Sequence, residues 1–205
     1  MKDDYVLQMI GRTNKLLIKD YLSSIEDIKA VVKKSKIIIL GGAGSIGSQV
    51  LYELFKMEPR LIHVVDINEN GLVEVVRNIR SSMGYIKGEF ETFAIDIGGK
   101  EFNKMVNKNG GYDIWMNFAA LKHVRSEKDP YTLMRLVEVN IINTYKTLML
   151  AKNTKALKYF SVSTDKAANP INLMGASKRA MELILGEFSE TLNTSSARFG
   201  NVAFS

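Results

Sequence analysis

The sequence predicts an α/β fold whose centre is a doubly wound sheet of parallel strands. From residue 36 onward, short apolar runs alternate with longer segments in which apolar residues recur at helical spacing. The first run, residues 37–40, is too short for a helix and ends directly in a glycine-rich turn. Repeated strand–helix units of this length form right-handed crossovers, so the strands are expected to be parallel.

The predicted elements follow one another without linkers, repeats or low-complexity segments. A helix is expected to begin at Ser45, directly after the glycine turn. The expected strands are residues 37–40, 61–65, 91–95, 112–116, 157–162 and 195–202, and the later helices are 70–80, 100–107, 130–152 and 172–191. These elements make residues 36–205 one domain.

Residues 1–35 precede the first strand and are predicted to form a helical appendage. Ser23 or Ser24, followed by Glu26 and Asp27, forms an N-cap pattern for a helix that continues through Val32. Packing or oligomer contacts are the expected role of this segment.

The composition is that of an ordered globular chain. Of the 205 residues, 46% are apolar and three are prolines, which suffices for one full core. Cysteine is absent, which excludes disulfides and thiolate chemistry and is typical of a reducing compartment. The sequence has no apolar run long enough for a membrane span and begins with a polar N-terminus, so we expect a cytoplasmic protein.

The formal net charge is +6, and the lysines are scattered along the chain. This charge fits either an ordinary solvated surface or a phosphate-bearing ligand. No basic run is interleaved with aromatic residues, so a nucleic-acid partner is not expected. The two histidines are far apart in the sequence, and without cysteine they predict no metal site. His63 lies within a predicted strand and is expected to be a core or cap residue.

The glycine turn is the strongest local pattern. Glycines between a strand and a helix let a pyrophosphate approach the first helical amides, which carry partial positive charge. Two glycine registers fit, 42/44/47 and 41/44/47, and a purely structural turn is the alternative reading. The expected dinucleotide contacts here are Gly41, Gly44, Ser45, Ile46 and Gly47.

Polar and small residues end the next strands, where parallel sheets bind ligands. Asp66 follows Gly47 at about the spacing at which a dinucleotide fold places a carboxylate on the adenosine ribose, which favours NAD over NADP. The alternative role of Asp66 is to cap a helix that begins near Asn68. Further cofactor contacts are expected at the adenine edge, from Asp96 and Ile97, and beside the fourth strand, from Ala119 and Ala120.

Five blocks occur in a characteristic order: residues 41–47, 119–124, 163–167, 169–178 and 198–202. With them the chain resembles the extended short-chain dehydrogenase/reductases of the polysaccharide-biosynthesis (CapD-like) type, which include nucleotide-sugar 4,6-dehydratases. The resemblance implies a Rossmann domain that binds NAD, a UDP-sugar substrate and a homo-oligomer, a dimer or higher. Relatives continue beyond the sixth strand with a substrate domain, so we expect a C-terminally truncated form from which that domain is largely absent.

The resemblance also implies catalytic roles. Such enzymes oxidise carbon 4 of the sugar, remove a proton from carbon 5 and expel the carbon 6 hydroxyl as water. Lys166 would be the base at carbon 5, Asp165 the acid at carbon 6, and Thr164 a hydrogen-bond partner of the carbon 4 oxygen. Lys178 would hold the nicotinamide ribose. Met174 stands where most of the superfamily has tyrosine, so Asp165 is expected to take over the proton exchange.

Further residues are candidates for substrate or structural contacts. Lys122 and His123, in the loop after the fourth strand, are candidates for substrate binding, with a structural histidine as the alternative. Asn201 matches a residue that contacts the nucleotide-sugar, whereas Arg198 is expected to be structural. Asn140 matches a helix asparagine that holds a backbone bend.

The expected function is an NAD-dependent 4,6-dehydratase of a UDP-N-acetylhexosamine in surface polysaccharide biosynthesis. A nucleotide-sugar 4-epimerase is the alternative with related chemistry, but epimerisation at carbon 4 needs no base at carbon 5. A non-catalytic dinucleotide-binding protein is the alternative from another class, and Met174 permits it.

Overall fold

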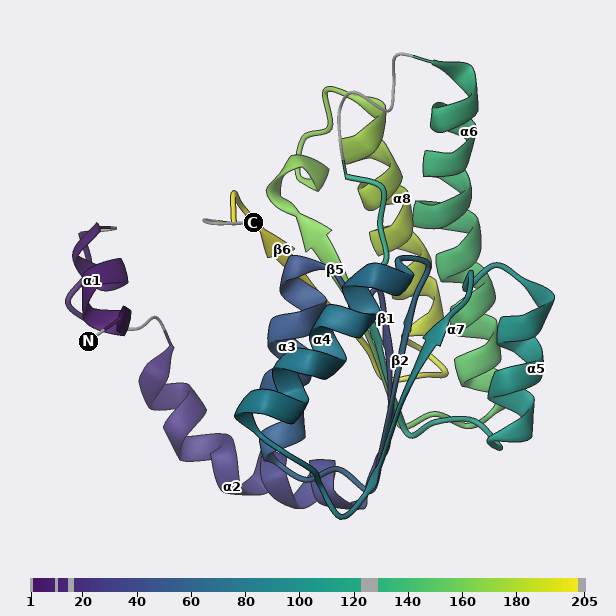
Figure 1. Ribbon diagram of the computed structural model, residues 1–205. Helices are drawn as coiled ribbons and strands as arrows, with labels where there is room; N and C mark the ends of the chain where they lie inside the picture. Colours follow the sequence, from purple (N-terminus) through teal and green to yellow (C-terminus); the bar gives the residue numbers. More distant parts are fainter. Residues whose placement is uncertain (1, 10, 15–16, 123–128, 203–205) are drawn as a thin grey trace.

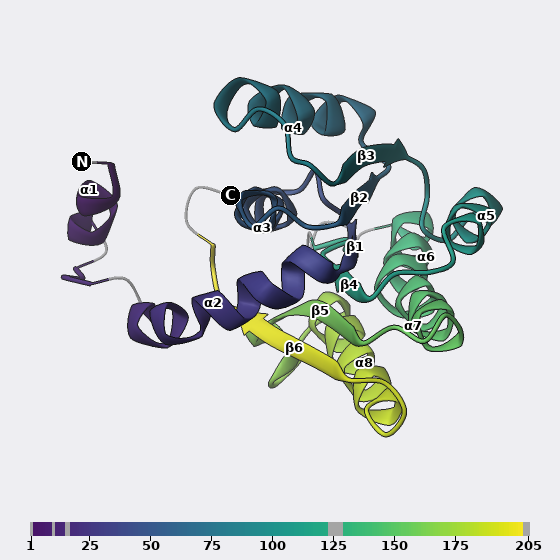
Figure 2. The ribbon, with the colours of Figure 1, turned by 90° about the horizontal axis from the view of Figure 1, so that it is seen from below.

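A computed structural model describes residues 2–9, 11–14, 17–122 and 129–202. They form one six-stranded sheet with helices on both faces (Figures 1 and 2). The strand order is β3-β2-β1-β4-β5-β6, and every neighbouring pair is parallel, which confirms the predicted fold class. The strands are β1 (Lys36–Leu40), β2 (Leu61–Asp66), β3 (Glu89–Ala94), β4 (Ile114–Asn117), β5 (Lys158–Thr164) and β6 (Thr194–Phe199).

The helices divide between the two faces of the sheet (Figure 2). One face carries α3 (Ser45–Lys56) and α4 (Glu69–Ser82). The other carries α5 (Lys100–Lys108), α6 (Pro130–Val137), the π-helical η2 (Glu138–Ile142), α7 (Asn143–Asn153) and α8 (Leu173–Phe188). The chain leaves β1 toward β2 and returns to place β4 on the other side of β1. The connections therefore diverge between β1 and β4, which is where a doubly wound sheet opens a crevice for ligands.

Two apolar cores flank the sheet. Ile37 and Ile39 of β1 belong to the core under α3 and α4, whereas Ile38 and Leu40 belong to the core around Trp115. A strand that buries both faces must be apolar at every position, which explains the unbroken apolar run in the sequence. The central strands are therefore buried on both faces, and the turns at their ends are anchored to this buried sheet.

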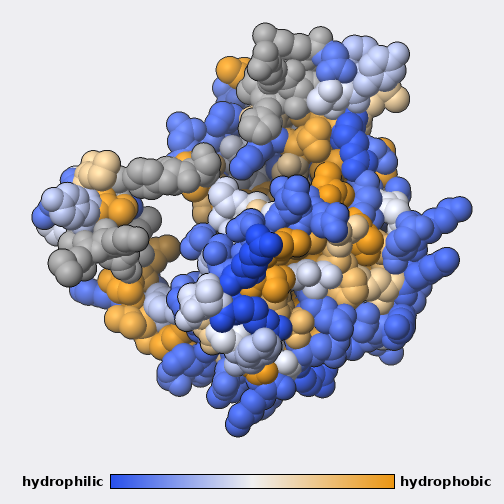
Figure 3. Space-filling view, in the orientation of Figure 1, coloured by the Kyte–Doolittle hydropathy of each residue, from blue (hydrophilic) through white to orange (hydrophobic). Residues whose placement is uncertain are grey.

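The N-terminal segment is helical, but its main helix begins earlier than predicted. It forms α1 (Lys2–Met9) and α2 (Ile18–Lys34), which project from the sheet (Figure 1). The N-cap predicted at Ser23 or Ser24 is wrong, because α2 begins at Ile18 and the Ser23 hydroxyl donates back to the Asp20 carbonyl inside the helix. Val32 is the buried residue of α2, and apolar surface remains open on this segment (Figure 3). Its role in oligomer contacts stays a prediction.

Smaller differences from the predicted elements also occur, including a fourth strand at Ile114–Asn117 and a last helix that ends at Phe188. The third strand was predicted at 91–95 but runs from Glu89 to Ala94, at an edge of the sheet where alternate side chains face solvent. The long helix predicted at 130–152 contains the π-helical η2, within which Asn140 lies. The sixth strand was predicted to reach residue 202, but it ends at Phe199, which pairs with the last residue of β5, Thr164. None of the helices in the described ranges has both the length and the apolarity to cross a membrane.

Candidate functional site

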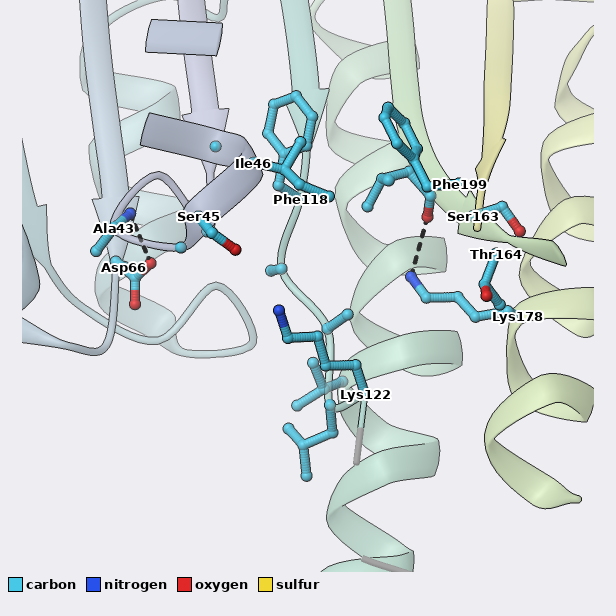
Figure 4. A pocket seen from close by; sticks show the side chains of 18 of the residues that line it. Ala43, Ser45, Ile46, Asp66, Phe118, Lys122, Ser163, Thr164, Lys178 and Phe199 are labelled. Carbon is cyan, nitrogen blue, oxygen red and sulfur yellow. Dashed lines mark hydrogen bonds between the residues drawn. The ribbon is translucent and has the colours of Figure 1, made fainter. Parts of the chain in front are cut away.

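A pocket of about 540 Å³ opens at the carboxyl ends of the strands (Figure 4). Most of the residues predicted for the site line it. They are Gly41, Gly44, Ser45, Ile46, Gly47, Asp66, Asp96, Ile97, Ala119, Ala120, Lys122, Thr164, Lys166, Met174, Lys178 and Asn201. Asp165 is not among the lining residues, and His123 lies outside the residues that the structure describes.

The glycine turn adopts the register 41/44/47. Gly41 has a φ of 74°, and a Cβ atom there would lie 2.5 Å from the Ala119 nitrogen. A Cβ atom at Gly47 would overlap the Gly41 carbonyl, so this pair must both be glycine. Gly42 instead faces Val64 of β2 and does not line the pocket. Across the described ranges no side chain caps the start of α3, which leaves its first amides available for an anion in the pocket.

Asp66 links the turns after β1 and β2. Its carboxylate accepts hydrogen bonds from the Ala43 amide at 2.9 Å (Figure 4) and from the Asn68 amide at 3.0 Å. Asn68, not Asp66, caps α4, because its side chain accepts from the Gly71 amide. The alternative role of Asp66 as the helix cap is therefore wrong, and its carboxylate borders the pocket beside the glycine turn.

Asp96 forms an ion pair that the sequence did not predict. Its carboxylate accepts from the Gly98 amide at 2.8 Å and from Arg135 at 2.5 Å, and Arg135 also pairs with Glu138 at 2.8 Å. Burial raises the pKa of Asp96, but the Gly98 amide and Arg135 together bring that pKa below its ordinary value. Asp96 is therefore an ionised hydrogen-bond acceptor in the pocket wall. Arg135 lies on α6, far along the chain, so no local pattern indicated it.

Two buried asparagines hold the loop after β4. Asn117 accepts from the Ala119 amide and donates to the hydroxyls of Thr144 and Tyr159. Asn140 accepts from the Leu121 amide and donates to the Leu121 carbonyl and the Ser177 hydroxyl. The expectation that Asn140 lies at a helix irregularity is confirmed by η2, and these bonds fix residues 119–121 along the pocket.

Lys178 is a buried cation in the wall opposite the glycine turn. Its side chain is 5% exposed, and Nζ donates to the Val162 carbonyl at 3.1 Å (Figure 4). The other acceptor near Nζ in the described structure is the Met181 sulfur at 3.6 Å, which is weak. Burial lowers the pKa of Lys178 to about 8, although Glu182 acts in the opposite direction. An ammonium group with three donors and one strong acceptor has capacity for ligand oxygens.

Met174 lies one turn before Lys178 on α8 and also lines the pocket. It is buried, and its thioether has no proton to exchange. The structure therefore places Met174, which stands where most of the superfamily has tyrosine, in the pocket, and its side chain cannot transfer a proton.

The loop from Thr164 to Lys166 follows β5 as predicted. Thr164 caps the short helix η3 (Asp165–Ala167), and its hydroxyl donates to Asp165 at 2.9 Å. The Lys166 ammonium lies 3.4 Å from the same carboxylate, whose side chain is 57% exposed. The Thr164 hydrogen bond and the Lys166 charge place the pKa of Asp165 below its ordinary value. Asp165 is thus an ionised, outward-facing group here, whereas a general acid must carry a proton.

Lys122 and Asn201 both line the pocket. Figure 4 shows Lys122 extending from the loop after β4 into the space between the glycine turn and Lys178. Arg198 is structural, as expected, because its guanidinium makes two hydrogen bonds of 2.8 and 2.7 Å to Glu182.

His63 is a core residue, 1% exposed. Its Nδ1 lies 2.8 Å from the Tyr112 hydroxyl, and its Nε2 lies 3.1 Å from Glu89 and 4.0 Å from Glu91. His63, Glu89 and Glu91 lie close enough together to hold a metal ion, a grouping that the spacing of the histidines in the sequence did not indicate. The register of β2 and β3 brings these side chains together. The short Nε2–Glu89 separation is that of a hydrogen bond.

Curated relatives and solved structures agree with this architecture. Residues 37–205 match the family model described as "Polysaccharide biosynthesis protein". The chain is 33% identical to an uncharacterized membrane protein of Methanocaldococcus jannaschii, covering 86% of this chain and 52% of that protein. It is 32% identical to the capsular polysaccharide biosynthesis protein CapD of Staphylococcus aureus (81% and 28%), and 29% identical to the UDP-N-acetylglucosamine 4,6-dehydratase (inverting) of Campylobacter jejuni (82% and 47%). The chain therefore spans about half of these proteins or less.

Solved structures share the fold. Pen from Bacillus thuringiensis superimposes with a TM-score of 0.71 at 24% identity, covering 84% of this chain and 52% of that one. WbmG of Bordetella bronchiseptica, solved with NAD and UDP, gives 0.64 at 18% identity, covering 80% and 53%. The family match covers the sheet, the glycine turn and every described pocket residue. The chain belongs to the polysaccharide biosynthesis protein family and has the fold of the extended short-chain dehydrogenase/reductases.

Proposed function

We propose that this chain binds NAD and acts on a UDP-sugar, with 4,6-dehydration of a UDP-N-acetylhexosamine as the reaction. The observation that carries the cofactor assignment is the pairing of two features across one pocket. The uncapped start of α3 meets the glycine turn on one side, and the buried Lys178 ammonium, with spare donors, lies on the other. An elongated ligand with a central pyrophosphate and hydroxyl groups at its far end fits this pairing.

The residues of the pocket fit NAD in particular. Asp66 keeps a carboxylate beside the glycine turn, where it would accept hydrogen bonds from ribose hydroxyls and repel a 2′-phosphate. Lys178 would bind the ribose at the nicotinamide end. When bound, NAD supplies a hydride acceptor for carbon 4 of the sugar and later returns the hydride to carbon 6. WbmG, which has the same fold, was solved with NAD.

The proposed chemistry of this chain lies in the loop after β5. The Thr164 hydroxyl would hydrogen-bond to the oxygen on carbon 4, and Asp165 would accept the carbon 4 hydroxyl proton as the hydride leaves. Lys166, as an uncharged amine, would accept the proton from carbon 5 and return one there at the end. Asp165 would donate its proton to the carbon 6 hydroxyl, which leaves as water. Because its carboxylate is ionised and bound to Thr164, substrate binding must replace that hydrogen bond and exclude water for Asp165 to gain a proton. A relative named as a 4,6-dehydratase supports this reaction, and relatives named as UDP-glucose 4-epimerases support the alternative.

One incubation separates the candidate reactions. The full chain with NAD and UDP-N-acetylglucosamine is placed in deuterated water, and the sugar nucleotide is followed by mass spectrometry. A product that has lost water and gained deuterium at carbon 5 is expected. An isobaric product would instead identify a 4-epimerase, a reaction named for other relatives of this chain. NAD binding in calorimetry without any product would leave a dinucleotide-binding protein.

The variants Lys166→Met and Lys158→Met provide the matched comparison. Lys166 lines the pocket, whereas Lys158 is exposed at the opposite end of β5. Lys166→Met should abolish deuterium incorporation while retaining NAD binding, and Lys158→Met should change neither. Normal incorporation by Lys166→Met would show that another group is the base.

A further inference from the structure

Glu182 joins three elements behind the pocket. It lies on α8, one turn after Lys178, and its side chain is 12% exposed. The carboxylate accepts from the Ser163 hydroxyl of β5 at 2.6 Å and from Arg198 of β6 at 2.8 and 2.7 Å. Arg179 adds a weaker contact at 3.3 Å. Hydrogen bonds from Arg198 in particular lower the pKa of Glu182 to about 2, so this group is a permanent anion above that pH.

The bond to Ser163 acts on the catalytic loop. Ser163 directly precedes Thr164, and the preceding residue, Val162, supplies the carbonyl that receives the Lys178 ammonium. One carboxylate thus fixes the end of β5 at the point where it turns into η3. Movement of Ser163 would displace both Thr164 and the acceptor of Lys178.

The charge of Glu182 acts on Lys178. The ionisable groups on the surrounding elements are Lys122 after β4, the pair Asp165–Lys166 in η3, the pair Arg135–Glu138 on α6 and η2, and Arg198 on β6, with Arg179 on α8 itself. Of all these groups, Glu182 is the one whose charge raises the pKa of Lys178, whereas burial lowers it. Without it, the buried ammonium would lose the charge that offsets its burial, and Arg179 and Arg198 would lose the carboxylate that they share.

We propose that Glu182 is a positioning residue, which holds the end of β5 against α8 and compensates the buried charge of Lys178 so that this ammonium is available to the cofactor. The second half of this role rests on the proposed binding of NAD. The anchoring of β5 against α8 and the charge on Lys178 do not depend on NAD, so both can be tested in the cofactor-free chain.

The first experiment measures the charge on Lys178 directly. Protein labelled with ¹³C-lysine is titrated without cofactor, and the Cε resonance of Lys178 is assigned from Lys178→Met. In Glu182→Gln the pKa of Lys178 should fall from about 8 to below about 7. Glu187→Gln is the matched control, since Glu187 is exposed on the same helix and should leave the titration unchanged.

Arg198→Gln tests the same charge in the opposite direction. It removes a cation but leaves Glu182 ionised, so the pKa of Lys178 should rise. Damage to the packing of α8 would move both variants the same way, whereas charge compensation moves them apart. If Glu182→Gln does not fold, Arg198→Gln still shows whether the pKa of Lys178 rises or falls. An unchanged Lys178 titration in Glu182→Gln, a fall in Arg198→Gln, or a common direction would overturn the proposal.

The second experiment connects this charge to the cofactor. At pH 7.5, Glu182→Gln should bind NAD about fivefold to tenfold more weakly than the original chain, and it should recover at pH 6, where Lys178 is protonated again. Equal weakening at both pH values would mean that Glu182 acts through packing alone. Failure of the original chain to bind NAD would refute the proposed function and would leave the Lys178 titrations as evidence on Glu182.

Discussion

The two sides of the pocket are built in different ways. The β1–β2 side, residues 41–47 and 66–68, consists of backbone amides and one carboxylate bound to them. The β5–β6 side, residues 163–166 and 198–201, consists of side chains, and two of its reactive groups, Asp165 and Lys166, are paired with each other and exposed. On the first side the groups that would bind the cofactor are already in place, as a preformed cradle of backbone amides. On the second side Asp165 and Lys166 are bound to each other and not to a substrate.

Because of this difference, we expect cofactor affinity and turnover to respond to different mutations in this molecule. A preformed cradle loses little conformational entropy when a ligand arrives, so cofactor affinity should depend on backbone geometry. The catalytic groups must exchange partners before they act, so turnover should depend on what the substrate displaces. Changes on the β1–β2 side should therefore affect folding and affinity, and changes near Asp165 should affect rate alone.

The largest effect is expected from Gly41→Ala. The backbone there has positive φ, and the new Cβ would meet the Ala119 backbone, so both the fold and the pocket must shift. We expect unfolding free energy to fall by roughly 2–4 kcal/mol in urea denaturation, with loss of NAD binding. Gly84→Ala is the control, since Gly84 has the same φ sign but open space around it, and should cost about 1 kcal/mol. Equal losses in both variants would show that close packing at Ala119 is unimportant.

Lys178→Met should separate affinity from stability. Loss of the ammonium should weaken NAD binding at least about tenfold, or about 1.4 kcal/mol, in calorimetry. The melting temperature should be retained or raised, because a buried charge is replaced by an apolar group of similar length. A large drop in melting temperature would instead show that the bond to Val162 is a structural requirement.

Asp66→Asn should reduce cofactor discrimination. The original chain is expected to prefer NAD over NADP by at least about tenfold, because the carboxylate repels a 2′-phosphate. In the variant the two dissociation constants should approach each other. Asp27→Asn, on exposed α2, is a charge-matched control that should keep the preference. Equal affinities in the original chain would contradict the assignment of Asp66.

The pH dependence of stability should reveal the anchor at Glu182. Its pKa is about 2 in the folded chain and 4.5 for a free glutamate side chain, so the unfolded chain takes up this proton first as the pH falls. The stabilisation is therefore complete above about pH 4.5 and is lost as the pH falls toward 2. In thermal melts, the difference between the original chain and Glu182→Gln should shrink over that interval. A constant difference would show that the charge is not involved.

The smallest effect on binding is expected from Asp165→Asn. This carboxylate is exposed, does not line the pocket and contacts its own loop. NAD affinity should stay within about twofold of the original value in calorimetry, since no cofactor contact is lost. Turnover, where measurable, should fall by about 10²- to 10⁴-fold if Asp165 is the acid. A marked loss of NAD affinity would mean that the two sides of the pocket are coupled.

The parallel sheet, the glycine turn and the presence of Asp66 and Lys178 in the pocket could be predicted from the sequence. These follow from local rules: a buried strand must be apolar, a tight turn needs glycine, and parallel strands end at one edge of the sheet. The register of the glycines needed the structure, because Gly41 differs from Gly42 in its positive φ and in the neighbour that it approaches.

The ion pairs and hydrogen bonds between distant side chains became known only from the tertiary structure. Asp96 with Arg135, Glu182 with Ser163 and Arg198, and His63 with Glu89 each join residues on different elements. No periodic pattern encodes such pairs, because they depend on how helices and strands pack against one another. The same packing decides burial, and through burial it sets the charge that Lys178 brings to the pocket.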